Sequence, residues 1–352
     1  MIKSNIKAAI LTNLGTELKI VDDLSVQTLS ECQVLIKILY TGICKSQLME
    51  IDGMRGDDKW IPHCLGHEAV GIVEQVGKHT SKVKLGDMVV VGWIKGDGGS
   101  SDSPDFFSKT LGKVNAGQCT TFSSHTVVSE NRITKLPENF PINLGALFGC
   151  ALPTGAGIIL NEMSPNIDDT ILLIGLGGVG MSALLALNAL NIYNIICLDV
   201  DNDKLEMGKK FTGCITMNTS GLSKSQIKSS LLERYPEFAP FDYALDAAGR
   251  VETIELAFEA VKNTGTCFFA SHPENGHKIS IDPFDLLSGK KIFGSWGGGS
   301  QPDTIIPQLA KLFSSSHSQL EKIVTRYKGI ENINNAIKDL RDGKIVRAIL
   351  EV

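Results

Sequence analysis

The chain has 352 residues, of which 43% are hydrophobic and 21% charged, and its formal net charge is −5. This length exceeds what one hydrophobic core serves, so we expect two domains of ordinary globular composition. A chain of net negative charge without runs of Lys or Arg offers no basic patch for nucleic acid or a membrane surface. We find neither a signal-peptide pattern nor the run of about 18 apolar residues that a spanning helix needs, so a cytoplasmic protein is expected.

The first third of the chain alternates short β-rich runs with turns. Strands are predicted at 33–40, 69–76, 88–91 and 124–128, with a turn at 84–87. Residues 96–105 are rich in Gly, Ser and Asp and are expected to form an exposed loop. This spacing of short strands indicates a small antiparallel barrel.

From about residue 144 the pattern changes to alternating helices and strands. Helices are expected at 144–160, 181–190, 204–211 and 251–261, and strands at 171–174, 195–199, 243–246, 267–270 and 291–295. Such alternation predicts a parallel sheet with crossover helices. The tail should add helices at 305–313 and 330–342 and a closing strand at 348–352.

A glycine-rich turn lies between the first of these strands and its helix. The candidate cofactor-binding residues in this turn are Gly175, Gly177, Gly178, Val179 and Gly180. Glycines here permit a tight turn, and the following helix N-terminus offers N–H groups to a pyrophosphate.

An acidic residue, Asp199, ends the next predicted strand. Its carboxylate could accept both ribose hydroxyls and would repel a 2′-phosphate, which favours NAD over NADP. The competing interpretation is a structural glycine turn with a solvated aspartate. The register of strand, glycines, helix and acid argues against it.

Three residues in separate segments are candidate soft metal ligands: Cys44, His67 and Cys150. Two thiolates and one imidazole suit zinc and leave a fourth position for water or substrate. Their wide separation means that spacing alone does not identify a site. Taken singly, each is more often an interior residue. The eight cysteines are scattered through a long chain, which favours reduced thiols over a disulfide framework.

The chain resembles the zinc-dependent alcohol dehydrogenases of the medium-chain dehydrogenase/reductase family over nearly its whole length. The motifs that carry this resemblance are Thr41-Gly42-Ile43-Cys44, Gly66-His67-Glu68, Gly149-Cys150 with Thr154-Gly155, the glycine turn, and Asp282-Pro283-Phe284 with Leu287-Ser288-Gly289. The resemblance implies one catalytic zinc on Cys44, His67 and Cys150, with Glu68 beside it as an occasional extra ligand.

The resemblance also implies roles for six further residues. Ser46 would be the first hydroxyl of a proton relay, although a loop hydroxyl bonded to backbone is the alternative. Lys45 and Arg347 would contact the pyrophosphate, and Lys204 the adenosine ribose. Thr154 and Val179 would touch the nicotinamide. For the two lysines, a solvated surface role is nearly as good an interpretation.

The implied fold is α/β. A GroES-like β-barrel catalytic domain would span 1–151, a Rossmann doubly wound parallel-sheet coenzyme domain 152–296, and a return segment 297–352 would complete the catalytic domain. NAD and zinc would meet where the two domains join. The edge strand near 291–295 would pair with its mate in a homodimer, although homotetramers also occur in the family.

Three departures from the family pattern stand out. Residues 94–118 contain no cysteine where many relatives hold a structural zinc, and Cys119 stands alone, so one zinc per chain is predicted. Met49 replaces the histidine that ends the full proton relay, which leaves water, a cofactor hydroxyl or Glu50. Gln47 replaces an acidic residue that orients the ligand histidine, and this predicts weaker zinc binding or a shifted pH optimum.

The expected function is reversible hydride transfer between NAD and a small primary or secondary alcohol, polyols and sugar derivatives included. One alternative is a zinc-free quinone or enoyl reductase on the same scaffold, which the intact Cys-His-Cys set opposes. A second is a non-catalytic NAD-binding protein, which the missing relay histidine favours slightly and Ser46 opposes. No nucleic acid or membrane partner is expected.

Overall fold

The chain crosses from one folding unit to another after Ala151 and returns at Gln301. The computed structural model describes residues 2–352. The first unit runs to Ala151 and resumes at Gln301–Val352, while the second is Leu152–Ser300. The first four residues of the expected return segment 297–352 therefore belong to the second unit.

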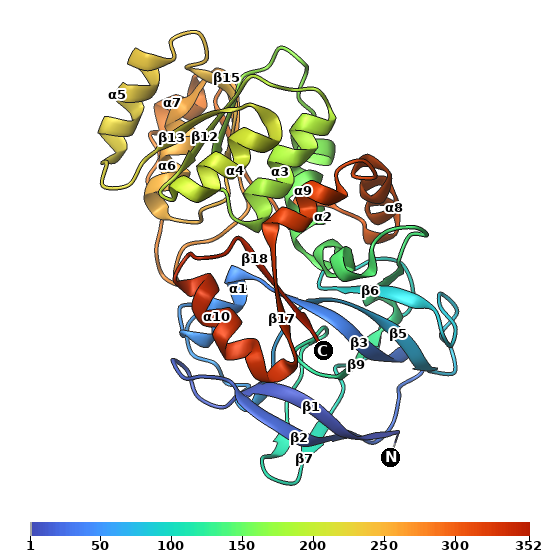
Figure 1. The fold of residues 1–352 in the computed structure, drawn as a ribbon. Coiled ribbons are helices and arrows are strands. Elements are labelled where there is room, and N and C mark those ends of the chain that lie inside the picture. The colour runs from blue at the N-terminus through green and yellow to red at the C-terminus, as the bar shows by residue number, and fades with distance from the viewer. Residues whose placement is uncertain (1) are drawn as a thin grey trace. The chain divides into compact units, whose positions relative to one another are not determined.

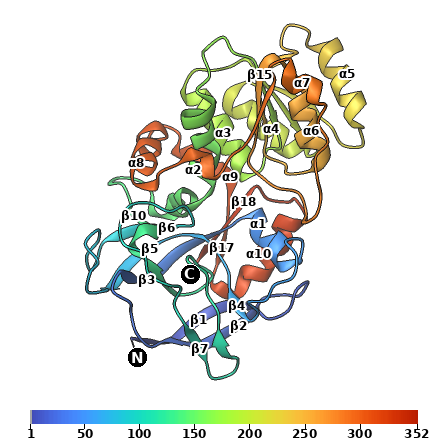
Figure 2. The same cartoon turned by 180° about the vertical axis from the view of Figure 1, so that it is seen from behind.

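The first unit is built from two sheets that are mostly antiparallel. One has the order β4–β1–β2–β7–β8, and Figure 2 shows β1, β2 and β7 side by side. Its strands are β1 (Lys3–Leu11), β2 (Lys19–Val26), β4 (His63–Cys64), β7 (Phe106–Ser108) and β8 (Gly112–Val114). The second has the order β10–β6–β5–β3–β18–β17, with β9 paired to β3. Its strands are β3 (Gln33–Ile43), β5 (Glu68–Val76), β6 (Met88–Gly92), β9 (His125–Ser129), β10 (Ile133–Lys135), β17 (Val324–Lys328) and β18 (Arg347–Glu351).

Most helices of this unit are short. They are α1 (Lys45–Ile51), η1 (Glu130–Arg132), η2 (Ile142–Gly149), α8 (Pro302–Leu312), α9 (His317–Ile323), η5 (Ile330–Asn332) and α10 (Ile333–Arg341). The apolar face of α10 buries Ile333, Ala336 and Ile337 in a core that also holds Leu48 of α1 and Leu350 of β18. Residues from both ends of the chain therefore share one core.

The second unit is a six-stranded parallel sheet with helices on both faces (Figure 1). The strand order is β13–β12–β11–β14–β15–β16. Its strands are β11 (Ile171–Ile174), β12 (Ile195–Asp199), β13 (Ile215–Asn218), β14 (Phe241–Asp246), β15 (Val261–Phe269) and β16 (Lys291–Gly294). Its helices are α3 (Gly178–Ala189), α4 (Asn202–Thr212), α5 (Lys224–Arg234), α6 (Val251–Ala260) and α7 (Pro283–Leu287), with the short η4 (Gly297–Gly299).

The predicted parallel sheet with crossover helices is confirmed. Strand β11 is wholly buried, as expected for a strand covered on both faces. The strand order reverses direction between β11 and β14, and such a switch point is where doubly wound sheets bind ligands at their carboxyl ends. The sequence analysis missed β13 and α5, although Ser223 and Gln226 form a capping box at the start of α5.

The single helix expected at 144–160 was wrong. The segment is a 3-10 helix η2, then α2 (Ala151–Gly157), then a π-helix η3 (Ile158–Met163). The break falls at Cys150, whose φ of −151° and ψ of −70° lie outside the helical region. Within residues 2–352 no single helix meets the length and apolarity needed to cross a membrane, although η2 and the helix after it, bent by 59°, meet it as a pair.

A buried carboxylate, that of Glu130, organises the loops around η1. One oxygen accepts the N–H of Ser81 at 3.0 Å and of Lys82 at 3.1 Å, and the other accepts the N–H of Gly99 at 2.7 Å. Burial would raise the pKa of Glu130, but these three donors outweigh it and hold that pKa below its usual value. Glu130 therefore anchors the 96–105 loop.

We expect Glu130→Gln to lower the free energy of unfolding by about 2–3 kcal/mol, because the amide NH₂ would face N–H donors that lose their acceptor. Urea unfolding measures the change, and Glu138→Gln, at an exposed carboxylate, is the matched control. Equal midpoints for the two variants would contradict the anchoring role.

Candidate functional site

Three loop-like positions of the first unit bring Cys44, His67 and Cys150 together. Cys44 follows β3 and is the N-cap of α1, with extended φ and ψ of −97° and 149°. His67 immediately precedes β5, and Cys150 occupies the break after η2. The ligand atoms of the three side chains lie within 4.8 Å of one another.

This cluster has the dimensions of a zinc site. The two sulfurs are 4.0 Å apart, and tetrahedral zinc with bonds of about 2.3 Å to sulfur separates two thiolates by about 3.8 Å. Nε2 of His67 is buried and has no hydrogen-bond partner within residues 2–352. An imidazole nitrogen left in that state fits a metal ligand, because burial without a partner is costly.

The thiol of Cys44 differs electrostatically from the buried thiol of Cys64. A hydrogen bond from Cys150 and the positive charge of Arg347 lower the pKa of Cys44 well below its usual value. By contrast, burial raises the pKa of Cys64 to about 12. Because the thiolate is the form that binds metal, this environment favours metal binding at Cys44.

A buried ion pair lies beside the cluster. Glu68 is 0% exposed and its Oε1 pairs with Arg347, which is 3% exposed. Burial raises the pKa of Glu68, an effect that Arg347 partly offsets. Gly42 leaves room for the Glu68 carboxylate, because a Cβ at that position would overlap Oε1. The sequence analysis did not foresee this pairing, although a charged residue at the head of the apolar strand β18 was a usable signal.

The residues expected to assist the metal centre lie along α1. Ser46 is half-buried in the first turn and Lys45 is exposed at its start. Met49 is half-buried, and Glu50 lies 3.6 Å from Arg55. The contacts of Arg347 are with Glu68, so the roles of Arg347 and Lys45 toward a pyrophosphate stay predictions.

Gln47 joins two of the three metal-ligand candidates. Its Oε1 accepts the backbone N–H of Cys44 at 2.9 Å, so its amide nitrogen faces Nδ1 of His67. The nitrogen of a carboxamide donates hydrogen bonds and cannot accept one. Metal binding through Nε2 of a neutral imidazole requires Nδ1 to carry the proton, which a facing donor opposes.

The glycine turn of the second unit has the geometry of a phosphate cradle. Gly175 has a φ of +91°, and a Cβ on Gly180 would overlap the carbonyl of Gly175. A Cβ on Gly177 would meet nothing within 4 Å, so the space beside it is open. Helix α3 begins at Gly178 with no side-chain cap, which leaves its first N–H groups for an anion.

Asp199 is held directly behind this turn. Its Oδ2 accepts the N–H of Leu176 at 2.6 Å and its Oδ1 that of Asp201 at 3.0 Å. Each oxygen keeps a second lone pair for a ribose hydroxyl. Lys204 lies one turn into α4 and pairs with Asp201 at 3.3 Å.

The two residues expected near the nicotinamide lie on packed helices. Thr154 of α2 is buried and its hydroxyl has no partner within residues 2–352. A Cβ on the next residue, Gly155, would overlap the carbonyl of Val179 in α3. The structure therefore brings the Thr154 segment against the first turn after the glycines.

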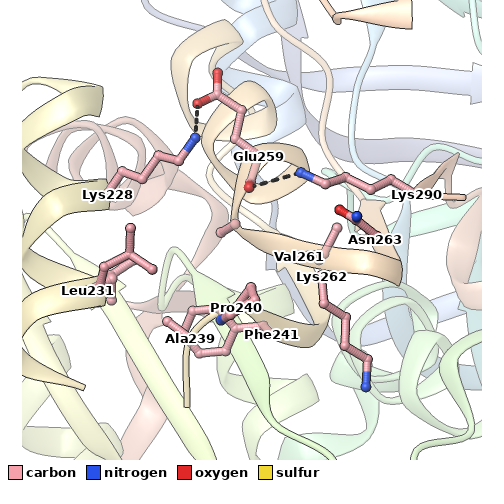
Figure 3. Close-up of a pocket in the computed structure, with 12 residues that line it drawn as sticks. Lys228, Leu231, Ala239, Pro240, Phe241, Glu259, Val261, Lys262, Asn263 and Lys290 are labelled. Atoms are coloured by element: carbon pink, nitrogen blue, oxygen red, sulfur yellow. Dashed lines mark hydrogen bonds and ion pairs between the residues drawn. The ribbon is translucent and has the colours of Figure 1, made fainter. Parts of the chain in front are cut away.

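A hollow of about 480 Å³ lies elsewhere in the second unit, at the amino ends of β14 and β15 (Figure 3). Its lysines are engaged: Lys228 pairs with Glu259 at 3.2 Å, Lys290 donates to the Glu259 carbonyl at 3.2 Å, and Lys262 pairs with Asp242. The glycine turn is at the opposite, carboxyl end of the sheet, so this hollow is not the coenzyme site.

Comparison with known proteins finds matches to most of each unit. The description "Alcohol dehydrogenase GroES-like domain" matches residues 30–138, and "Zinc-binding dehydrogenase" matches 178–315. The chain is 29% identical to Alcohol dehydrogenase-like 1 of Arabidopsis thaliana, covering 98% of this chain and 95% of the relative. It is 26% identical to S-(hydroxymethyl)glutathione dehydrogenase of Komagataella pastoris, covering 98% and 97%.

A solved structure, the alcohol dehydrogenase zinc-binding domain protein from Burkholderia ambifaria, aligns with a TM-score of 0.88 at 25% identity. That alignment covers 99% of this chain and 98% of the other. The fold is therefore shared along nearly the whole chain.

We expect Gln47→Glu to tighten zinc binding by about tenfold or more, since the new oxygen would accept the Nδ1–H that the present amide opposes. Competition with a chromogenic chelator measures the affinity without any turnover. Gln75→Glu adds the same charge at an exposed site and serves as control. An unchanged affinity in Gln47→Glu would show that the amide does not limit the ligand.

Proposed function

Because this chain belongs to the zinc-dependent alcohol dehydrogenases of the medium-chain dehydrogenase/reductase family, we propose that Cys44, His67 and Cys150 hold its catalytic zinc. The chain is an NAD-dependent oxidoreductase that acts on the CH–OH group of alcohols. The observation that carries the residue assignment is the convergence of three ligand atoms within 4.8 Å. Glu68 is then a neighbour of the metal, paired with Arg347 through Oε1.

A bound zinc supplies a Lewis acid that lowers the pKa of an alcohol hydroxyl. The chain's own residues then have three tasks. Cys44 and Cys150 hold the metal as thiolates, His67 completes the set, and Ser46 receives the proton that the alcohol releases. A neutral hydroxyl suits this relay, because it accepts one proton while passing on another.

The coenzyme is proposed to lie on the glycine turn of the second unit, with Asp199 on the adenosine ribose and Lys204 nearby. Thr154 and Val179 would position the nicotinamide, to which hydride passes. The two carboxylate oxygens of Asp199 favour NAD, since a 2′-phosphate there would be repelled. Substrates are proposed to be small primary or secondary alcohols, with polyols and sugar alcohols included.

We propose that the first unit is the catalytic domain and the second the coenzyme domain, close to the expected boundaries 1–151, 152–296 and 297–352. The cytoplasm is the proposed location, supported by eight cysteines that are all free thiols. A zinc-free reductase and a non-catalytic NAD-binding protein are not favoured, because the Cys-His-Cys cluster is complete.

We expect purified, zinc-loaded protein to reduce NAD with at least one alcohol from a panel of aliphatic, aromatic, polyol and sugar alcohols. Cys44→Ser should lose the metal and at least 99% of this activity. NADH absorbance and metal content are the measurements. Cys64→Ser, at a buried thiol outside the cluster, is the matched control and should keep its zinc. Turnover that survives in Cys44→Ser with the metal gone would exclude the proposed zinc chemistry.

A homo-oligomer is proposed to form through the edge strand β16, which pairs only with β15 within residues 2–352. Large apolar side chains are exposed near it, including Leu287 at 84% and Trp296 at 79%. An exposed apolar patch beside an unpaired strand edge is typical of an interface.

We expect light scattering to give at least twice the chain mass of 38.0 kDa. Leu287→Asp combined with Trp296→Asp should shift the particle to a smaller oligomer or a monomer, because charge would be buried at the interface. Leu232→Asp, at an exposed leucine on α5, should leave the mass unchanged. A monomeric wild type would exclude this assembly.

A further inference from the structure

A half-buried arginine, Arg132, ends η1 in the first unit without an acidic partner. Its Nη1 donates to the backbone carbonyl of Trp93, while its Nε is buried and has no hydrogen-bond partner. No Asp or Glu within residues 2–352 forms an ion pair with it. A guanidinium is always charged and offers five N–H donors, of which the Nε–H of Arg132 has no acceptor within residues 2–352.

The position of Arg132 relates it to the metal centre through Trp93. The Trp93 ring lies edge-on to the His67 ring with centroids 6.5 Å apart. Trp93 directly follows β6, and Ile133, next to Arg132, pairs with Val91 of that strand. On the other side of β6, Gly92 pairs with Glu68. Strand β6 therefore lies between Arg132 and Glu68, the residue next to the candidate ligand His67.

Cys119 supports the same placement. Burial raises the pKa of Cys119 to about 12, the charge of Arg132 opposes this rise, and the charge of Glu68 adds to it. One thiol thus lies within electrostatic range of both Arg132 and the carboxylate beside the metal centre.

The side chain of the preceding residue, Asn131, also lacks hydrogen-bond partners. It is 1% exposed, and neither its Oδ1 nor its Nδ2 has a partner within residues 2–352. Its backbone is engaged, since its carbonyl accepts the N–H of Gly96 at 2.8 Å. Two consecutive residues thus leave three buried polar atoms without partners, a costly arrangement unless something binds there.

The nearby carboxylates form no ion pair with Arg132. Glu130 accepts three backbone N–H groups, and Glu68 pairs with Arg347 through Oε1, while its Oε2 is buried without a hydrogen-bond partner within residues 2–352. An external anion would supply the counter-charge that Arg132 lacks.

We propose that Arg132 and Asn131 bind the anionic end of the substrate, so that the enzyme acts on alcohols that carry an oxyanion group, a carboxylate or a phosphate. This inference rests on the proposed function, since it places the oxidised CH–OH group at the metal centre. The guanidinium provides paired N–H donors for the oxyanion, and the amide of Asn131 provides a donor and an acceptor for a neighbouring hydroxyl.

The test compares alcohols that differ only in charge. The kcat/KM for 4-(hydroxymethyl)benzoate and for 4-(hydroxymethyl)phenyl phosphate is measured against that for benzyl alcohol, with zinc-loaded enzyme and NAD. We expect at least a tenfold preference for one charged alcohol, and the larger of the two ratios identifies the oxyanion. In Arg132→Met this ratio should fall to near one, and Arg132→Lys should recover part of it. Arg234→Met, at an exposed arginine on α5, should keep the wild-type ratio.

Binding provides a readout that is independent of turnover. Calorimetry should show that the wild-type protein binds benzoate, or phenyl phosphate, at least tenfold more tightly than benzamide. Equal affinities, or a charge preference that persists in Arg132→Met, would overturn the inference. If Arg132→Met does not fold, Arg132→Lys and the wild-type binding data decide. Preferential anion binding without oxidation of any alcohol would overturn the proposed function and leave the anion site supported.

Discussion

The geometry of the metal centre depends on an ion pair that water does not reach. Glu68 begins β5 and Arg347 begins β18, and both strands pair with β3, whose end leads into Cys44. Their salt bridge therefore fastens together the strands that set the position of the first ligand. Removing one partner from such a pair leaves an uncompensated buried charge, at a typical cost of about 3–5 kcal/mol.

Charge balance explains how so many ionisable groups fit in one buried place. Glu68 and Arg347 cancel one another, and two thiolates cancel a divalent metal. The hydrogen bond to Cys44 and burial raise the pKa of Cys150 well above its usual value, so without the metal this sulfur keeps its proton. With zinc bound, the site would be neutral in two separate groups, the ion pair and the metal with its two thiolates, and each group must be complete for burial to cost little.

The local features of the second unit were readable from sequence, because their signals are short-range. Gly175 and Gly180 lie in one turn, and Asp199 ends the adjoining strand, so spacing carried the information. The metal ligands were recognised only through family resemblance, since they come together by folding of distant segments. The structure clusters Cys44, His67 and Cys150, and their metal role is a proposal that metal analysis tests.

Other features had no usable local pattern. The helix expected across Cys150 is broken because that residue adopts a non-helical backbone, which composition does not reveal. The anchoring of loops by Glu130 depends on backbone N–H groups, and these leave no trace in side-chain identity. Arg132 resembles any solvated arginine until the structure shows that its Nε is buried without a hydrogen-bond partner.

The discontinuous first unit also has a consequence for how the protein is made. Cys44, His67 and Cys150 leave the ribosome before the second unit, whereas Arg347 and β18 follow it. At roughly 5–20 residues per second, the wait from the first ligand to Arg347 is on the order of tens of seconds. During that time Glu68 lacks its counter-charge and β3 lacks one neighbour, so the nascent first unit exposes an unpaired strand edge. The second unit, continuous in sequence, can fold within that interval and would be complete before the metal centre closes.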